Sequence, residues 1–231
     1  RQDGGGVYVV KDATLSLIDS VIGGSTSQLH HGGGIFNAGA VTLTGSTLSA
    51  NIAHDRGGGV MGDFNSTLTI EAGSLLTGNR AGEGGGGLFN DAIPALIQDS
   101  TIKDNIVDHG SGGGILNYGG TVQLTRSAVT GNTASVSGGG LYNVQAMTVT
   151  NTTISGNTAG GVGGGVDNEN TLSMANTTIV GNTADGDAQG TDVGGGLFTG
   201  AGIVVYARNS ILAGNRHLQG GTASPVAVAD D

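Results

Sequence analysis

The chain has 231 residues, 48 of them glycine, no cysteine, and a formal net charge of −10. The acidic balance and the scatter of only eight Lys and Arg residues argue against a nucleic acid or an anionic membrane surface as partner. Without cysteine the chain forms neither a disulfide framework nor a thiolate metal site. No apolar run of about 18 residues is present, so we expect no segment that spans a membrane.

A block of glycines recurs along the whole chain. Its third member falls 25 to 31 residues after the previous one, at Gly6, Gly34, Gly59, Gly87, Gly114, Gly140, Gly165 and Gly196. A second marker, an asparagine three residues after a Leu, Ile or Val, keeps the same period at Asn51, Asn79, Asn105, Asn132, Asn157, Asn182 and Asn215. Repetition at such a period is the signature of stacked structural units, so the sequence predicts a solenoid of about eight coils.

Each coil is expected to contain three short strands. The first follows the glycine block, the second includes stretches such as 41–44 and 121–124, and the third carries the aliphatic residue of the asparagine marker. No apolar spacing of helical period persists, so helix is not expected. Parallel crossover connections are overwhelmingly right-handed, and the prediction is therefore a right-handed parallel β-helix.

Polar ladders are predicted at the corners of the coils. The marker asparagines tolerate a left-handed backbone and can pass amide hydrogen bonds from coil to coil. A second asparagine column, broken by Gly62 and Thr199, follows the glycines at Asn37, Asn90, Asn117, Asn143 and Asn168. A small hydroxylic residue stands five before each marker asparagine and should point inward, at Ser46, Ser74, Ser100, Ser127, Thr152, Thr177 and Ser210.

The repeat defines the domain organisation. Residues 1–215 are predicted to form one β-helix repeat domain, and residues 216–231 a partial last coil or a C-terminal linker. Because Arg1 opens the chain inside a repeat, we expect the chain to be an excised or matured piece of a polypeptide.

The alternation of Gly-Gly-Gly-aliphatic blocks with aliphatic-x-x-Asn motifs, from Gly4 to Asn215, resembles the repeats of chlamydial-type polymorphic outer membrane proteins and of bacterial secreted proteins with a pectin-lyase-like β-helix. This chain departs from the pattern of that family in two ways. The family often carries Ala or Ser as the third residue of the glycine block, where this chain has Gly, and often Phe at the start of the Asn motif, where this chain has Leu, Ile or Val. The resemblance implies a bacterial protein that is extracellular or on the cell surface. It implies no catalytic residues, because the repeats of that family are structural.

The loops between each marker asparagine and the next glycine block hold the candidate binding residues. They are His54, Asp55, Glu83, Asp108 and His109, with His30, His31 and Arg56 nearby. His54 and His109 occupy equivalent places two coils apart, roughly 10 Å for stacked strands, which is too far for both to bind one metal directly. The alternative interpretation is that all of these residues are solvated loop positions.

One loop is a candidate calcium site. Asp185, Asp187 and Asp192 offer three carboxylates, which hard cations such as Ca²⁺ favour, although the spacing is not that of an EF-hand. The alternative is a flexible acidic loop. We expect no other cofactor.

Two functional hypotheses follow. The first is a secreted or surface-displayed β-helix that acts without catalysis as an adhesin stalk, passenger or fibre-forming unit, stacking through its coil edges on a second copy or on further repeats. The alternative is a glycan-binding or polysaccharide-degrading β-helix, a lyase or hydrolase, that uses the acidic and histidine-bearing loops. Such an enzyme needs converging carboxylates or a cation with a base, and Asp99 and Asp104 do not converge.

Overall fold

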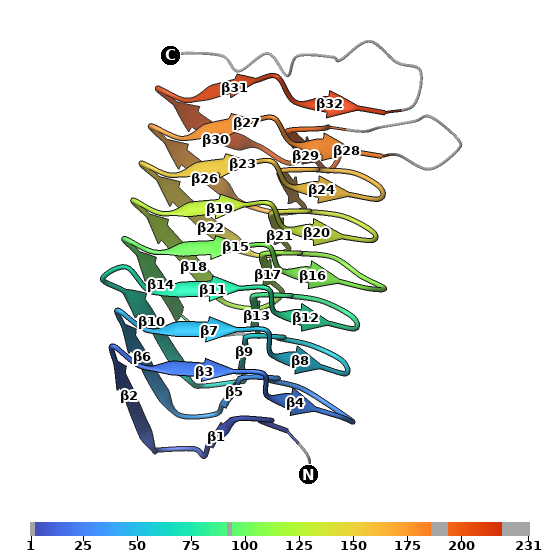
Figure 1. Cartoon of the computed structure of the whole chain (residues 1–231). Helices are drawn as coiled ribbons and strands as arrows, with labels where there is room; N and C mark the ends of the chain where they lie inside the picture. The colour runs from blue at the N-terminus through green and yellow to red at the C-terminus, as the bar shows by residue number, and fades with distance from the viewer. Residues whose placement is uncertain (1–2, 92–93, 186–193, 219–231) are drawn as a thin grey trace.

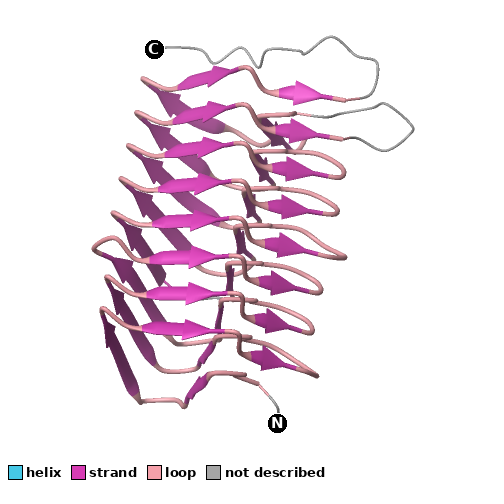
Figure 2. Cartoon of the chain, in the orientation of Figure 1, coloured by secondary structure: helices cyan, strands magenta, loops and turns pink. Residues whose placement is uncertain are grey.

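The computed structural model describes residues 3–91, 94–185 and 194–218. All regular structure in these ranges is β-strand (Figure 2). The strands form four parallel sheets of eight strands each, and the chain visits the sheets in the same order in every coil (Figure 1). The molecule is a right-handed parallel β-helix of about seven turns.

The four sheets, named here A to D in the order in which each coil visits them, have the following strands. Sheet A contains β1 (Val7–Val9), β5 (Ile35–Asn37), β9 (Val60–Gly62), β13 (Leu88–Asn90), β17 (Ile115–Asn117), β21 (Leu141–Asn143), β25 (Val166–Asn168) and β29 (Leu197–Thr199). Sheet B contains β2 (Thr14–Ile18), β6 (Ala40–Thr44), β10 (Thr67–Glu71), β14 (Pro94–Gln98), β18 (Thr121–Thr125), β22 (Ala146–Thr150), β26 (Leu172–Ala175) and β30 (Val205–Arg208). Sheet C contains β3 (Val21–Gly23), β7 (Thr47–Ser49), β11 (Leu75–Thr77), β15 (Thr101–Lys103), β19 (Ala128–Thr130), β23 (Thr153–Ser155), β27 (Thr178–Val180) and β31 (Ile211–Ala213). Sheet D contains β4 (Thr26–Ser27), β8 (Ile52–Ala53), β12 (Arg80–Ala81), β16 (Ile106–Val107), β20 (Thr133–Ala134), β24 (Thr158–Ala159), β28 (Thr183–Ala184) and β32 (Arg216–His217).

The predicted β-helix is confirmed, but the prediction of three strands per coil was wrong. A fourth strand of two residues, such as β8, follows each marker asparagine directly. Two residues show one outward and one inward side chain, which is too short for an alternating pattern to be recognised in the sequence. This fourth strand and the loop after it project from the body of the coil (Figure 1).

The core is a thin column of aliphatic side chains. In β6 the inward Val41 and Leu43 are buried, while Thr42 and Thr44 on the outer side are half-buried. Leu48, the aliphatic residue of the marker, belongs to the same core cluster. The alternation of burial along each strand is the period-two pattern that the sequence shows, and it fixes the register of every sheet.

The marker asparagines form a buried ladder through the molecule, as predicted. The Asn105 Oδ1 accepts hydrogen bonds from the backbone N of Asn79 at 2.9 Å and from its Nδ2 at 3.0 Å. The Asn105 Nδ2 donates to the Leu76 carbonyl at 3.0 Å and to the Asn132 Oδ1 at 2.9 Å. Because the same four bonds recur from coil to coil, each asparagine satisfies polar groups of both neighbouring coils.

A second asparagine ladder runs inside sheet A. The Asn90 Nδ2 donates to the Asn117 Oδ1 at 2.8 Å, and the Asn117 Nδ2 donates to the Asn143 Oδ1 at 2.9 Å. Gly62 interrupts the column in β9, and there the Asn37 Nδ2 donates to the Thr67 carbonyl at 2.9 Å instead. The predicted break therefore leaves the polar groups of Asn37 satisfied by backbone.

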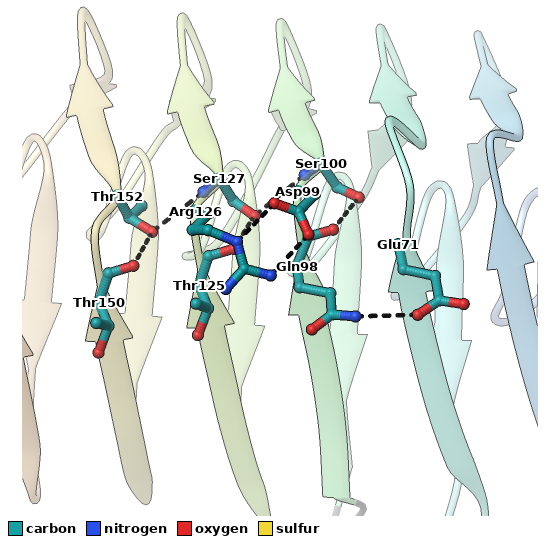
Figure 3. A network of polar contacts seen from close by, with 9 residues as sticks. All are labelled: Glu71, Gln98, Asp99, Ser100, Thr125, Arg126, Ser127, Thr150 and Thr152. Atoms are coloured by element: carbon teal, nitrogen blue, oxygen red, sulfur yellow. Dashed lines mark hydrogen bonds and ion pairs between the residues drawn. The ribbon is translucent and has the colours of Figure 1, made fainter.

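The hydroxylic residues form a third ladder at the corner between sheets B and C (Figure 3). The Ser100 backbone N donates to the Ser127 Oγ at 3.2 Å, and the Ser127 backbone N donates to the Thr152 Oγ1 at 3.3 Å. Most of these hydroxyls donate in turn to the carbonyl two residues earlier, as from Ser127 to Thr125 at 2.8 Å, whereas Ser74 donates to the Glu71 carbonyl at 2.6 Å. These side chains are buried, as the sequence predicts, except that of Ser210 in the last described coil, which is half-buried.

The glycine blocks are required by the close stacking of the coils. Gly57 has a φ of +68°, and a Cβ added to Gly58 would lie 2.5 Å from the Gly86 carbonyl oxygen. A Cβ on Gly59 would lie 2.6 Å from the Gly87 oxygen. Any larger residue would therefore push two neighbouring coils apart.

Removal of one central asparagine of the ladder should lower the free energy of unfolding more than a substitution at the surface does. We expect Asn105→Ala to lower the free energy of unfolding by roughly 3–5 kcal/mol, because several buried polar groups of the adjacent coils lose their partners, each at about 1–3 kcal/mol. Ser25→Asn should stabilise by up to about 1 kcal/mol, because Ser25 holds the marker position of the first coil and an amide there reaches the Asn51 Oδ1. Urea denaturation of both variants checks this, and an unchanged midpoint for Asn105→Ala would contradict the role of the ladder.

A backbone prediction concerns the residue before each marker asparagine. Gly181 there has a φ of +64° with no heavy atom within 4 Å of an added Cβ, whereas Ala50 adopts a φ of 52° with a side chain. Gly181→Ala should destabilise by about 1–2 kcal/mol and Ala50→Gly should stabilise by a smaller amount, because the left-handed region penalises a Cβ. Thermal unfolding of the two variants measures both signs, and equal signs would contradict the backbone explanation.

Candidate functional site

The candidate loop residues lie on the segments that return from sheet D to sheet A. These segments follow the projecting strands of sheet D and stack on one another, with Arg56, Gly84 and Ser111 in parallel β-bridges. The structure therefore brings loop residues of neighbouring coils side by side, as the repeat predicts. It does not gather all of them into one site.

Asp55 is the centre of one group. The His54 Nδ1 lies 2.7 Å from the Asp55 Oδ1, and the Nδ1 atoms of His30 and His31 lie 3.7 Å and 3.9 Å from the Asp55 Oδ2. Burial alone would raise the pKa of Asp55, but the hydrogen bond with His54 and the charges of His31, His54 and His30 together lower it below the usual 3.8. Three histidines from two coils thus favour an ionised Asp55.

The other predicted carboxylates are held in ion pairs between coils. The Arg56 Nε lies 3.3 Å from the Glu83 Oε2, and the Arg80 Nε lies 2.8 Å from the Asp108 Oδ2. The Arg56 guanidinium also lies 5.1 Å from the centre of the Phe89 ring, in a cation–π contact. His109 contributes its backbone N, which donates to the Gly82 carbonyl at 2.8 Å. The exposed pairs join neighbouring coils, and their net contribution to stability is small.

Of the three aspartates predicted to bind calcium, the structure describes only Asp185. Asp185 is exposed at the end of β28, while Asp187 and Asp192 lie outside the described residues. Among the residues that the structure describes, no group of three or more His, Cys, Asp or Glu side chains is arranged to hold a metal ion. The calcium loop therefore stays a prediction.

Asp99 and Asp104 are separate, as expected from the sequence. Asp99 forms a two-pronged pair with Arg126, with both nitrogen–oxygen distances at 2.7 Å, and Asp104 lies 3.8 Å from the Lys103 Nζ (Figure 3 shows the first pair). The hydrogen bond from Arg126 lowers the pKa of Asp99. Arg126 itself has a φ of 48°, a left-handed conformation in an exposed corner. Asp99 therefore holds Arg126 in place and leaves no free carboxylate pair for catalysis at this corner.

The sequence analysis missed a buried carboxyl in the middle of sheet A. The central, outward residue of each A strand forms a column in register, made of Tyr8, Phe36, Met61, Phe89, Leu116, Tyr142, Asp167 and Phe198. Seven of these side chains are apolar or aromatic, and Phe36, Met61, Phe89 and Leu116 pack into a cluster of their own. Asp167 replaces an apolar side chain at this position. The signal was present in the sequence, two residues after the third glycine of each block.

The environment of Asp167 strongly favours the neutral acid. The side chain is only 2% exposed, and its Oδ1 has no hydrogen-bond partner. Burial raises the pKa of Asp167 to about 7, helped by the charge of Glu169 and a hydrogen bond with it, while a hydrogen bond with Ser137 lowers it. Burial, then Asp167 and Glu169, also raise the pKa of the neighbouring Tyr142. Asp167, with Glu169 as its neighbour, is thus a buried carboxyl that the search of the loops did not include.

Comparison of the chain with protein-family models, with curated proteins and with solved structures gave no match. The described ranges contain no helix with the length and apolar character that a membrane span requires. The architecture and the residues themselves are therefore the basis for a functional proposal.

Asp55 provides a pH-dependent test. Its pKa is lowered in the folded state, so its contribution to stability is present above pH 3.8 and is lost as the pH falls through the folded value. Asp55→Asn should therefore reduce stability near neutral pH, and this cost should shrink below that value. Thermal unfolding measured from neutral pH to below pH 3.8 checks this prediction. Asp12→Asn, a change at an exposed turn, is the control. A loss of stability in Asp55→Asn that grows as the pH falls would contradict the assignment.

Proposed function

We propose that the chain is a structural β-helix, a rigid stalk or assembly unit that acts outside the cell or on its surface by stacking coil upon coil. The observation that supports this most directly is the open first coil. In the described ranges β1, β2, β3 and β4 each stand at the edge of their sheet, with a strand on one side only. A parallel edge of this kind offers unpaired backbone groups to another chain or to further repeats.

The side chains of the first coil fit this role. Leu15, Leu17 and Ile22 occupy core positions but are only partly buried, whereas the equivalent Val41, Leu43 and Leu48 of the next coil are buried. A coil stacked on this end would bury the remaining apolar surface, at about 25 cal/mol per Å². The Ser25 backbone N donates to the Asn51 Oδ1 at 3.0 Å, so the hydrogen bonding of the asparagine ladder extends to the first coil.

The ion pairs support a structural role. Asp55, Glu83, Asp99 and Asp108 each lie within 4 Å of a histidine or arginine on the same or an adjacent coil. Side chains used in this way connect coils and are not aimed at a common point. Among the described loop residues, Asp55, Glu83 and Asp108 therefore do not provide the pair of free carboxylates that glycoside hydrolysis requires.

Glycan binding is a second candidate, and one aromatic side chain favours it. Tyr118 is 54% exposed at the end of β17 and lies 6.0 Å from the ring of Phe89, which makes it a possible stacking platform for a sugar ring. Tyr142, which follows the next glycine block, is half-buried and offers less of its ring to a sugar. A glycan array with wild type and Tyr118→Ala tests this candidate, and signals that do not differ between the two proteins would reject the platform.

A charge placed in the open core should block stacking. We expect wild-type protein to form end-to-end oligomers or fibres as its concentration rises from micromolar to millimolar, and Leu17→Lys to prevent this, because an inward charge at an edge strand cannot be buried. Ser16→Lys, on the exposed outer side of the same strand, is the matched control and should assemble like wild type. Negative-stain images and light scattering give the readout.

Two observations keep this test decisive. Hydrogen exchange of the β6 amides reports whether the second coil stays folded in Leu17→Lys. Wild-type protein that remains as single short rods at every concentration would contradict an assembly role, as would equal assembly of the two lysine variants.

A further inference from the structure

The carboxyl pair of Asp167 and Glu169 is a feature that a purely structural rod does not require. Asp167 is the central residue of β25, and Glu169 follows this strand directly, two residues later. Residues two apart lie on the same side of a strand, and the charge of Glu169 and a hydrogen bond with it help to raise the pKa of Asp167. The pair faces outward from sheet A, yet Asp167 is almost fully buried.

The groups around Asp167 offer no positive charge. From β21 it faces Tyr142, and from β29 it faces Phe198, both in register with it. From the return segments it meets the Ser137 hydroxyl and the backbone at Gly163, where an added Cβ would lie 2.7 Å from the Asp167 Cβ. Glu169 and Tyr142 are thus the titratable groups that surround it within the described residues, and neither can neutralise an ionised Asp167.

An ionised Asp167 in this position would lack solvation and would be repelled by the charge of Glu169. Burying an unpaired charge is costly, and carboxyl groups in contact avoid this cost when one of them keeps its proton. The retained proton then donates the hydrogen bond that joins the two side chains. Seven apolar residues in the same column show that sheet A tolerates a neutral side chain at this place without further support.

We propose that the buried Asp167 keeps its proton in the native state beside Glu169, and that the neutral side chain, packed between Tyr142 and Phe198, forms an acid-stabilised latch between the coil of β25 and its neighbours. The proton is released when this coil opens, because the two carboxyl groups then separate and become hydrated. The contribution of Asp167 to the stability of the coils around β25 should therefore be largest under acidic conditions and decrease as the pH rises. This inference is independent of the stacking of the first coil.

The direction of the pH dependence follows from linkage. The pKa of Asp167 is about 7 when folded and near 3.8 when exposed, so the stabilisation is complete below 3.8 and is lost as the pH rises through about 7. Between these values the unfolding equilibrium constant should rise by up to about tenfold per pH unit from this group, and above them it should level off.

The experiment compares the full chain with matched variants by hydrogen exchange and denaturant unfolding in a chelating buffer. Asp167→Asn keeps an amide that donates to Glu169 and loses the titrating proton, so its stability relative to wild type should increase steadily up to about pH 7. Amides of β25 and its neighbours should exchange faster, after correction for intrinsic rates, above neutral pH in wild type only. Amides of the distant β9 should not distinguish the two proteins.

A second variant and a direct titration keep the inference falsifiable. Asp167→Leu restores the apolar character of the column and should also remove the pH dependence, even if the asparagine variant folds poorly. A carbon-13 carboxyl resonance of Asp167 that titrates near neutral pH, with a pKa that falls in Glu169→Gln, supports a proton retained on Asp167. A resonance that titrates near 3.8, or parallel pH profiles for wild type and both Asp167 variants, would overturn the proposal. Recovery of wild-type stability by Ca²⁺ above neutral pH, absent in Asp167→Asn, would also overturn it, because the pair would then hold a cation in place of the proton.

Discussion

The backbone of each inner coil hydrogen-bonds to the coils on both sides in strict register, and every other feature of the molecule depends on this stacking. Gly33, Gly58 and Gly86 of successive blocks lie so close that no Cβ fits between them. The same closeness brings equivalent side chains directly over one another, so each residue type is selected for contact with its own kind. Aliphatic residues then form the core, and asparagines form ladders.

The asparagine ladder joins coils that would be unstable alone into one cooperative structure. A single coil has a thin core and cannot bury its apolar face alone. The buried amides add directional bonds, and each one ties the backbone N and the side chain of one coil to the next. Since a buried amide without partners is costly, the ladder penalises any slip in register as well as any missing member.

Charged residues divide into two groups in this architecture. Those on the return segments and corners, such as Glu83, Asp108 and Arg126, lie at the surface and pair with the neighbouring coil. Asp167 stands in a column of apolar side chains and is buried with Glu169 as its close neighbour. The first group explains how an acidic chain packs its coils without strong repulsion. Within the part of the chain that the structure describes, Asp167 is the one buried carboxyl that breaks the repeat, and such breaks are where a function beyond scaffolding is expected.

The sequence by itself determined the fold, because a solenoid stacks equivalent positions and any column of side chains can be read from the period alone. The inward places of Leu48 and Ser46, the ladder of Asn79 and Asn105, and the break at Gly62 were all predictable in this way. The tertiary structure decided the features that the repeat period does not encode. It added the two-residue strands of sheet D, it placed His30, His31 and His54 around Asp55, and it covered the outer face of sheet A with the return segments. That cover is why Asp167 is buried, since an outward residue on a strand is exposed unless another part of the chain folds over it.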